Sequence, residues 1–349
     1  MSPRRTRKRI VVLSDIHLGD SRSTLQKPEV VDALIKELNG GKKIDELILL
    51  GDILDLAFST FHDVIDRART FFDQISTLNA GKFIYIPGNH DYHIWLLHIE
   101  KRDIIEPVQN EGLPKLPDYM GQFINGEPFF SEVLPEDLEE KLEIRYPNYE
   151  CEISGTRYFF HHGHQIYGPG VLLMGPREAI NEGKGLNDLL IANSPILELI
   201  YYHLERDREM MQKLEVAWRK YGSPGALLVV LNEMLDARVP KFVKLLIHVI
   251  RTTWLRLTLL TIKKDRGTEI DDIQTEILDY LELCGRQLKN PLRFIFGHSH
   301  VPGTKEIDEN LTAFNSGSWL KEDARHNTYL SIEDNVVTLR RLGEKDPIL

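Results

Sequence analysis

Short apolar runs alternate with amphipathic ones along the first ninety residues, and this alternation constrains the fold more than any other feature of the sequence. The apolar runs at 9–13, 46–50 and 82–86 are rich in Ile, Leu and Val, as buried strands are. The runs between them, 28–41 and about 60–79, have helical spacing, with Pro28 in the first turn of the earlier one. Strand, helix, strand, helix, strand predicts parallel strands with helices packed on the faces of a sheet.

The rest of the chain divides into three stretches. Residues 92–154 are rich in proline, and we expect loops with short helices there. After a strand near 157–161, residues 165–289 show long helical patterns. Strand patterns then resume at 292–296 and continue to 342, with turns that predict an antiparallel ending. We therefore expect an α/β core formed by 1–164 and 290–349, with a helical cap inserted over 165–289.

Composition argues against a nucleic-acid-binding protein, a disulfide-stabilised protein and a secreted protein. The net charge of -10 is unlike that of a generic nucleic-acid-binding protein, which needs a basic surface. Cys151 and Cys284 are far apart and have no metal-type spacing, so we expect no disulfide framework and a cytoplasmic location. The basic start, residues 1–9, lacks the apolar segment of a secretory signal, and we interpret it as a solvated terminus.

Five predicted strands share one property, which is that side chains able to bind a metal follow directly after each of them. In α/β sheets, ligands bind beyond the carboxyl ends of the strands, so these groups are expected to meet at one site. In extended backbone His298 and His300 would also point to the same side. The five groups are Asp15 with His17, Asp52 with Asp55, Asn89 with His90 and Asp91, His162 with His164, and His298 with His300.

The donor types at these strand ends indicate which metals the site would take. Carboxylate, imidazole and amide oxygen suit Mn²⁺, Fe or Zn²⁺, and no thiolate is among them. We therefore predict a centre of two divalent metal ions. Mn²⁺ is the ion that we favour, with Fe or Zn²⁺ as alternatives.

The motifs "DIH", "GDILD", "GNHD", "HHGH" and "GHSH", in this order, resemble the five blocks of the calcineurin-like metallophosphoesterases. The resemblance implies a four-layer α/β/β/α sandwich over the core. It favours His162 over the adjacent His161 as a ligand because His162 directly precedes Gly163, and it leaves the role of His164 open. The implied ligands are Asp15, His17 and His300 for one ion, Asn89, His162 and His298 for the other, and Asp52 as a bridge between the two.

The chemistry that this centre implies is hydrolysis of a phosphoester. Two cations lower the pKa of a bridging water and neutralise the phosphoryl oxygens, so hydroxide would attack without a covalent enzyme intermediate. His90 would contact the phosphate or protonate the leaving oxygen, and Asp91 would orient His90. For Asp55 we expect a supporting or turn role.

Departures from known blocks narrow the substrate. The phosphoprotein phosphatases of this superfamily carry an arginine after the second aspartate of the second block, where this chain has Leu56. The start "SDIHLGD" and a helical insertion before "GHSH" resemble the UDP-2,3-diacylglucosamine pyrophosphohydrolases, although those enzymes usually have arginine in place of His90. We expect hydrolysis of a phosphodiester or pyrophosphate bond in a small or lipid-linked molecule. A nuclease and a non-catalytic metal-binding scaffold are the alternatives.

One stretch of the insertion, residues 237–267, combines basic and apolar side chains. Lys244, His248 and Arg251 recur there at helical spacing, and charges in the middle of the stretch make it a poor membrane-spanning segment. Four interpretations stay open: a packed helix with snorkelling cations, a lid that contacts an acidic substrate, a peripheral contact with anionic lipid, or a homodimer contact. Lys244 and Arg251 are accordingly candidate substrate contacts.

Overall fold

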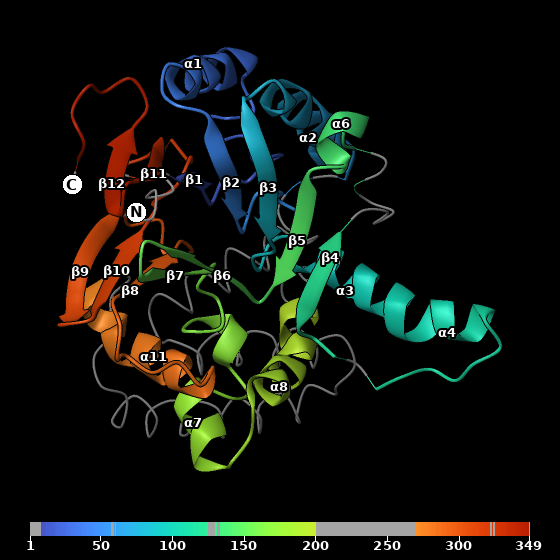
Figure 1. Ribbon diagram of the computed structural model, residues 1–349. Coiled ribbons are helices and arrows are strands. Elements are labelled where there is room, and N and C mark those ends of the chain that lie inside the picture. The colour runs from blue at the N-terminus through green and yellow to red at the C-terminus, as the bar shows by residue number, and fades with distance from the viewer. Residues whose placement is uncertain are drawn as a thin grey trace, which may run out of the picture. The chain divides into compact units, whose positions relative to one another are not determined.

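The computed structural model describes residues 8–56, 59, 61–116, 118–124, 130, 133–199, 270–321, 323 and 325–348, and all of these belong to one compact unit. Two sheets face each other at its centre (Figure 1). The first sheet has the order β12-β11-β1-β2-β3-β5-β4. Its strands are β1 (Arg9–Leu13), β2 (Ile44–Leu50), β3 (Ala80–Ile86), β4 (Gly121–Ile124), β5 (Leu142–Tyr146), β11 (Thr328–Glu333) and β12 (Val336–Arg341).

The second sheet has the order β6-β7-β8-β10-β9. Its strands are β6 (Asn148–Ile153), β7 (Thr156–His161), β8 (Leu292–Phe296), β9 (Gly303–Asp308) and β10 (Leu311–Asn315). In both sheets the middle is parallel and the edges are antiparallel: β1, β2, β3 and β5 run together in one, and β7, β8 and β10 run together in the other. The carboxyl ends of the strands that precede the predicted motifs therefore gather at one edge of each sheet.

The alternation of side chains along each strand explains the layers. In β1, Val11 and Leu13 belong to the core formed with α1 (Pro28–Asn39) and α2 (Phe61–Ser76), whereas Ile10 and Val12 belong to the core between the sheets. In the second sheet, Phe160 faces the inter-sheet core. These strands are buried on both faces, which is why they are continuous apolar runs.

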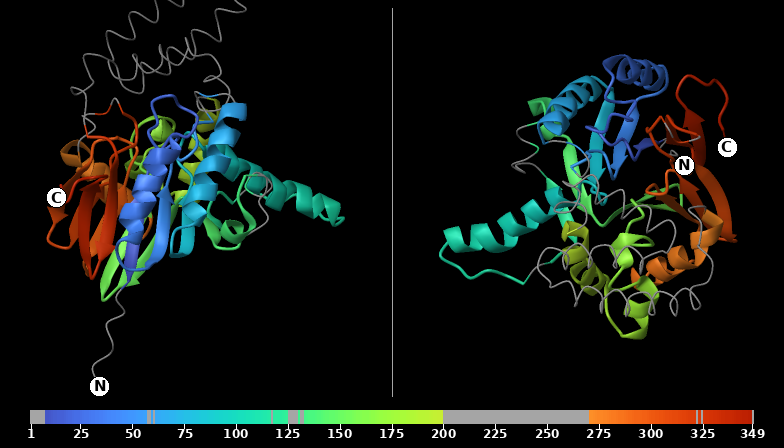
Figure 2. Two further views of the ribbon diagram at one scale, coloured as in Figure 1. Left: turned by 90° about the horizontal axis from the view of Figure 1, so that it is seen from above. Right: turned by 180° about the vertical axis from the view of Figure 1, so that it is seen from behind.

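The outer face of the second sheet is covered by α11 (Ile270–Leu283). Phe159 and Phe294 pack there with the apolar face of this helix, Ile273 and Ile277 among it. Helix, sheet, sheet and helix are thus stacked in four layers, which the two views of Figure 2 show from further sides. The predicted mixed α/β sandwich is confirmed.

The proline-rich stretch 92–154 is more ordered than the sequence suggested. It contains β4, β5 and β6 beside α3 (Tyr92–Glu100), the π-helical turn η1 (Lys101–Ile105), α4 (Glu106–Gln109) and α6 (Glu136–Glu139). The expectation of loops was wrong for β5 because its polar positions are paired: Glu143 binds Lys82 at 2.6 Å and Arg145 at 2.8 Å. The antiparallel ending was right for β9 with β10 and for β11 with β12, but β10 also runs parallel to β8.

The described parts of the predicted insertion contain four helices joined by turns and irregular segments. They are η2 (Pro169–Val171), α7 (Pro176–Asn181), α8 (Leu186–Glu198) and α11. Residues 200–269 lie outside the described part of the chain, so the extent of the insertion and its role as a cap stay predictions. Within the described residues, every helix is too short or too polar to cross a membrane.

Candidate metal centre

The two sheets bring the predicted metal-binding residues together. The first sheet supplies those that follow β1, β2 and β3, and the second sheet supplies those that follow β7 and β8. Asp15, Asp52 and His162 are at most 1% exposed, so the centre is closed off from bulk water on several sides. Buried carboxylates and imidazoles at such density need compensating charge, because burial of an unpaired charge is costly. The residues that meet are Asp15, His17, Asp52, Asn89, His90, His162, His298 and His300.

The backbone at the centre is strained. Five of the seven predicted ligands have left-handed φ angles, which non-glycine residues rarely adopt. Backbone hydrogen bonds between the loops hold two of them in place: the N–H of Asp15 donates to the carbonyl of Gly51 at 3.0 Å, and the N–H of His17 donates to the carbonyl of Asp52 at 2.9 Å. The φ angles are 52° at Asp15, 53° at His17, 52° at Asp52, 67° at His298 and 60° at His300.

Two glycines are required by close approach to the ligands. Gly51 has a φ of 78°, and a Cβ at this position would collide with the ring of His162. A Cβ at Gly297 would collide with a carboxylate oxygen of Asp15. The glycines in the second and fifth motifs therefore let backbone pack directly against a predicted ligand from the other sheet.

One cluster of donors consists of Asp15, His17 and His300. The His300 Nε2 lies 3.3 Å from Oδ1 of Asp15 and 3.3 Å from Nε2 of His17. Two imidazole nitrogens bound to one tetrahedral ion at about 2.0–2.1 Å are about 3.3–3.4 Å apart. The separations in this cluster therefore fit donors that share one cation.

The second cluster is built around His162. Its Nδ1–H donates to the carbonyl of Leu50 at 2.9 Å, which leaves Nε2 free to bind a metal. That Nε2 lies 3.2 Å from Oδ2 of Asp52 and 3.2 Å from Oδ1 of Asn89, and His298 completes the group. The same Asp52 oxygen is 3.9 Å from Nε2 of His17, so this carboxylate lies between the two clusters.

The electrostatics of the centre favour positive charge at the same places. Burial opposes protonation of His162, but the Asp52 carboxylate outweighs it and raises the pKa of His162 to about 9. Burial likewise opposes protonation of His300, while Asp15 and Asp323 raise its pKa to about 10. Burial and the neighbouring His90 hold the pKa of His17 well below its usual value. The carboxylates of Asp52, Asp15 and Asp323 thus stabilise positive charge at the centre, and the donor set fits divalent ions in that role.

His90 is oriented by a different carboxylate from the one that we expected. Its Nδ1 is 3.2 Å from Oδ1 of Asp55, and its ring lies edge-on to His17 with the ring centroids 4.6 Å apart. Asp91 instead accepts hydrogen bonds from the N–H groups of Gly88 and Ile53 and from the hydroxyl of Tyr85. Asp91 therefore fixes the turn after β3 and holds it against the loop after β2, which corrects its predicted role.

Asp323 is a residue of the centre that the sequence did not reveal. Its Oδ2 lies 3.1 Å from Nδ1 of His300, and Ser318 donates a hydrogen bond to the same oxygen. A carboxylate that accepts from the distal nitrogen of a metal-binding histidine fixes the orientation of the ring. No motif surrounds Asp323, and only the fold brings it to His300.

The neighbouring histidines are engaged elsewhere. His161 contacts Gln165, with its Nε2 2.6 Å from Oε1, and packs against Tyr280. The structure thus places His162, not His161, beside Asp52. His164 lies close to Gln165 and 3.1 Å from the hydroxyl of Tyr146, within the protein interior. Lys244 and Arg251 fall outside the described residues.

The fold and this cluster of donors define a class of metal-dependent hydrolase, and comparison with known proteins gives its family. The chain belongs to the calcineurin-like phosphoesterase family, which matches residues 8–216, and it is therefore a phosphoester hydrolase. Members of this family use divalent metals. Among curated proteins, none matches the chain significantly.

Solved structures of low sequence identity also resemble the chain. A dimetal phosphatase from Danio rerio is 10% identical, with 98% of each chain covered and a TM-score of 0.45. A metallophosphoesterase from Sphaerobacter thermophilus is 12% identical, with 97% of this chain and 89% of that one covered and a TM-score of 0.34.

Proposed function

We propose that this protein hydrolyses a phosphodiester or pyrophosphate bond in a small or lipid-linked substrate at a pair of divalent metal ions. The observation that supports this most is that donors from both sheets meet in two adjacent clusters, with Asp52 between them. When bound, two such ions would supply an activated water and positive charge for the phosphoryl oxygens. The proposed ligands are Asp15, His17 and His300 on one side, Asn89, His162 and His298 on the other, and Asp52 for both.

The roles proposed for the other residues follow from their contacts. Asp55 holds the ring of His90 with its Nε2 directed toward the centre, 4.0 Å from Asp52. From there His90 would contact a phosphoryl oxygen or give a proton to the leaving oxygen. Asp323 would hold His300 in the orientation in which its Nε2 faces Asp15.

The identity of the metal is proposed from the donors alone. Imidazole, carboxylate and amide oxygen without thiolate suit Mn²⁺, and they also suit Fe or Zn²⁺. The resemblance to UDP-2,3-diacylglucosamine pyrophosphohydrolases stays a proposal for the substrate. The sequence supports four further proposals. They are a cytoplasmic location, a peripheral membrane contact, a homodimer, and substrate contacts from Lys244 and Arg251.

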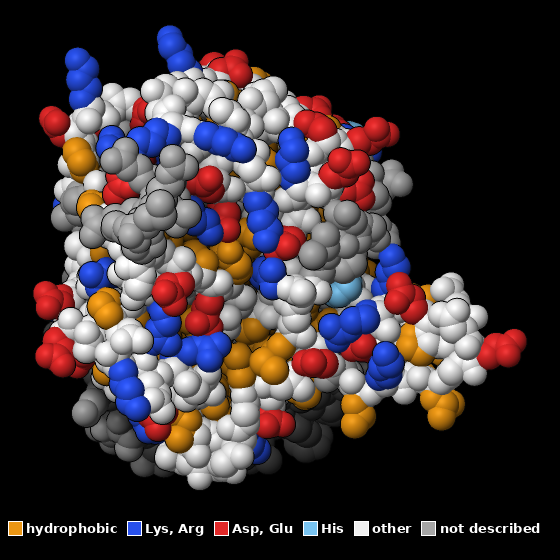
Figure 3. Space-filling view, in the orientation of Figure 1, with side chains coloured by type: hydrophobic (Ala, Val, Ile, Leu, Met, Phe, Trp, Pro, Cys, Tyr) orange, Lys and Arg blue, Asp and Glu red, His pale blue; other side chains and the backbone are white. Residues whose placement is uncertain are grey.

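A nuclease is the second enzyme activity to consider, and surface charge weighs against it. On the face shown in Figure 3, Lys and Arg side chains of the described residues are interspersed with Asp and Glu. The net charge of the chain is -10. DNA binding through phosphate contacts needs a positive surface, so we expect no salt-sensitive DNA binding.

The test is hydrolysis of bis-p-nitrophenyl phosphate beside p-nitrophenyl phosphate by metal-stripped protein, with and without added Mn²⁺. Activity that depends on Mn²⁺, favours the diester and disappears in Asp52→Ala would support the proposal. Asp137→Asn, an exposed change on α6, is the control and should keep full activity. Folded protein that binds two metal ions per chain and cleaves neither ester would favour the scaffold alternative.

A further inference from the structure

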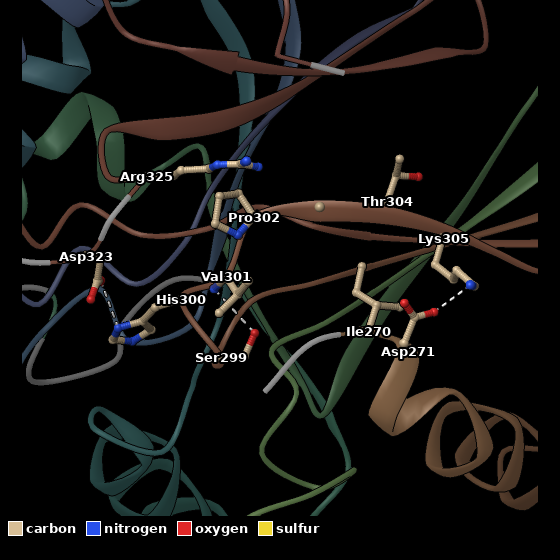
Figure 4. Close-up of a pocket in the computed structure, with 11 residues that line it drawn as sticks. Ile270, Asp271, Ser299, His300, Val301, Pro302, Thr304, Lys305, Asp323 and Arg325 are labelled. Carbon is tan, nitrogen blue, oxygen red and sulfur yellow. Dashed lines mark hydrogen bonds and ion pairs between the residues drawn. The ribbon is translucent and has the colours of Figure 1, made fainter. Parts of the chain in front are cut away.

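A pocket of about 450 Å³ lies next to the proposed metal centre (Figure 4). His300 forms part of its wall, so the pocket adjoins the proposed centre at this ligand. The other walls come from the loop after β8, the start of β9, the first residues of α11 and the segment around Arg325. The volume lies in the range of small-molecule binding sites, which is about 300–1,000 Å³.

Most charges around this pocket are already paired. The Lys305 ammonium lies 2.5 Å from the Asp271 carboxylate, and His300 lies 3.1 Å from Asp323, as the dashed lines in Figure 4 show. The Lys305–Asp271 pair therefore leaves little net charge to recognise a ligand, and the Asp323 carboxylate is engaged by His300. The exception is Arg325, which is exposed and has no hydrogen-bond or ion-pair partner among the residues that the structure describes.

The pocket also has an apolar wall. Ile270, Val301 and Pro302 line it, and Val301 is 36% exposed although it directly follows the proposed ligand His300. An apolar wall beside a guanidinium that no described residue pairs suits an amphipathic group, in which an uncharged body carries one acidic end. Guanidinium binds phosphate and carboxylate through two parallel hydrogen bonds, which makes it specific for such an end.

We propose that this pocket binds a second acidic group of the substrate, a phosphate or carboxylate separate from the scissile phosphoester, and that Arg325 contacts it. The proposal rests on the proposed function, because it places the scissile phosphorus beside His300. It makes Arg325 a determinant of substrate specificity. The preferred substrate is then a small molecule with two acidic groups joined by a partly apolar body.

The experiment measures binding, so that it does not depend on turnover. Alkylphosphonates of increasing chain length are titrated by calorimetry into the Mn²⁺-loaded protein. Each is compared with the compound of equal length that ends in a carboxylate and with the one that ends in a second phosphonate. At the chain length that fits the pocket, the wild-type protein is expected to bind one acidic compound about tenfold more tightly than its uncharged counterpart.

Variants decide whether Arg325 is responsible for that preference. Arg325→Ala is expected to abolish the tenfold ratio, and Arg325→Lys to keep part of it because the charge is retained. Arg67→Ala removes an exposed arginine from α2, and this control should keep the whole ratio. The carboxylate and the phosphonate series show which acidic group is preferred.

Two results would overturn the proposal. One is a wild-type protein that shows no preference for an acidic end at any chain length, and the other is a preference that survives in Arg325→Ala. Neither depends on the proposed activity, which fails separately if the Mn²⁺-loaded wild-type protein cleaves neither p-nitrophenyl ester.

Discussion

Replacement of Asp323 by asparagine tests whether a residue outside every motif supports the metal centre. The change Asp323→Asn keeps the shape of the side chain but removes the charge that faces Nδ1 of His300 at 3.1 Å. Loss of a carboxylate behind a metal-binding histidine typically costs about 10–100-fold in metal affinity. The Asp323 side chain is 28% exposed, so water replaces part of the interaction and we expect the lower end, about tenfold.

The assay is a calorimetric titration of Mn²⁺ into metal-stripped protein. Of two binding events, only the one assigned to Asp15, His17 and His300 should weaken in Asp323→Asn, because His162 has its own partner in the carbonyl of Leu50. Asp137→Asn is the matched control and should bind both ions as the wild type does. Wild-type affinity for both ions in Asp323→Asn would refute the reasoning.

Three further predictions concern the centre and the core. Gly51→Ala should lower the free energy of unfolding by about 2–4 kcal/mol in urea titrations, because its Cβ meets the ring of His162 and its φ is positive; unchanged stability would show that the loops adjust freely. His90→Gln should slow hydrolysis of an alkyl ester more than that of a p-nitrophenyl ester, as loss of a general acid would, and Asp55→Asn should show the same pattern; equal losses on both esters would instead indicate a phosphate contact. Burial, with help from nearby cations, lowers the pKa of His98 to about 4, so the stability that its neutral form contributes is present above about pH 6.5 and is lost as pH falls toward 4. In His98→Phe that part of the decline should be absent from thermal unfolding measured across this range, and a decline equal to that of the wild type would contradict the assignment.

The sequence by itself determined the central strands and the place of the candidate site. Apolar runs such as 9–13 and 46–50 form strands that are buried on both faces, so nearly all their residues are apolar and the sequence predicts them clearly. Each of these runs ends where the chain turns sharply. The metal-capable groups follow those ends directly, and their order along the chain is enough to group Asp15, Asp52 and His162. Strand β5 was missed because only alternate residues of it are buried and the charge of Glu143 is paired by Lys82 of another strand.

Only the tertiary structure decided which groups support the centre. In the folded protein, Asp55 and not Asp91 orients the ring of His90. Asp91 instead accepts hydrogen bonds from the turn after β3 and from the loop after β2. The fold also brought Asp323 to His300 and Arg325 to the neighbouring pocket, although the two strands β9 and β10 separate both residues from His300 in the sequence. Such contacts depend on how two sheets meet, and spacing along a chain carries no information about side chains that meet only through long-range packing.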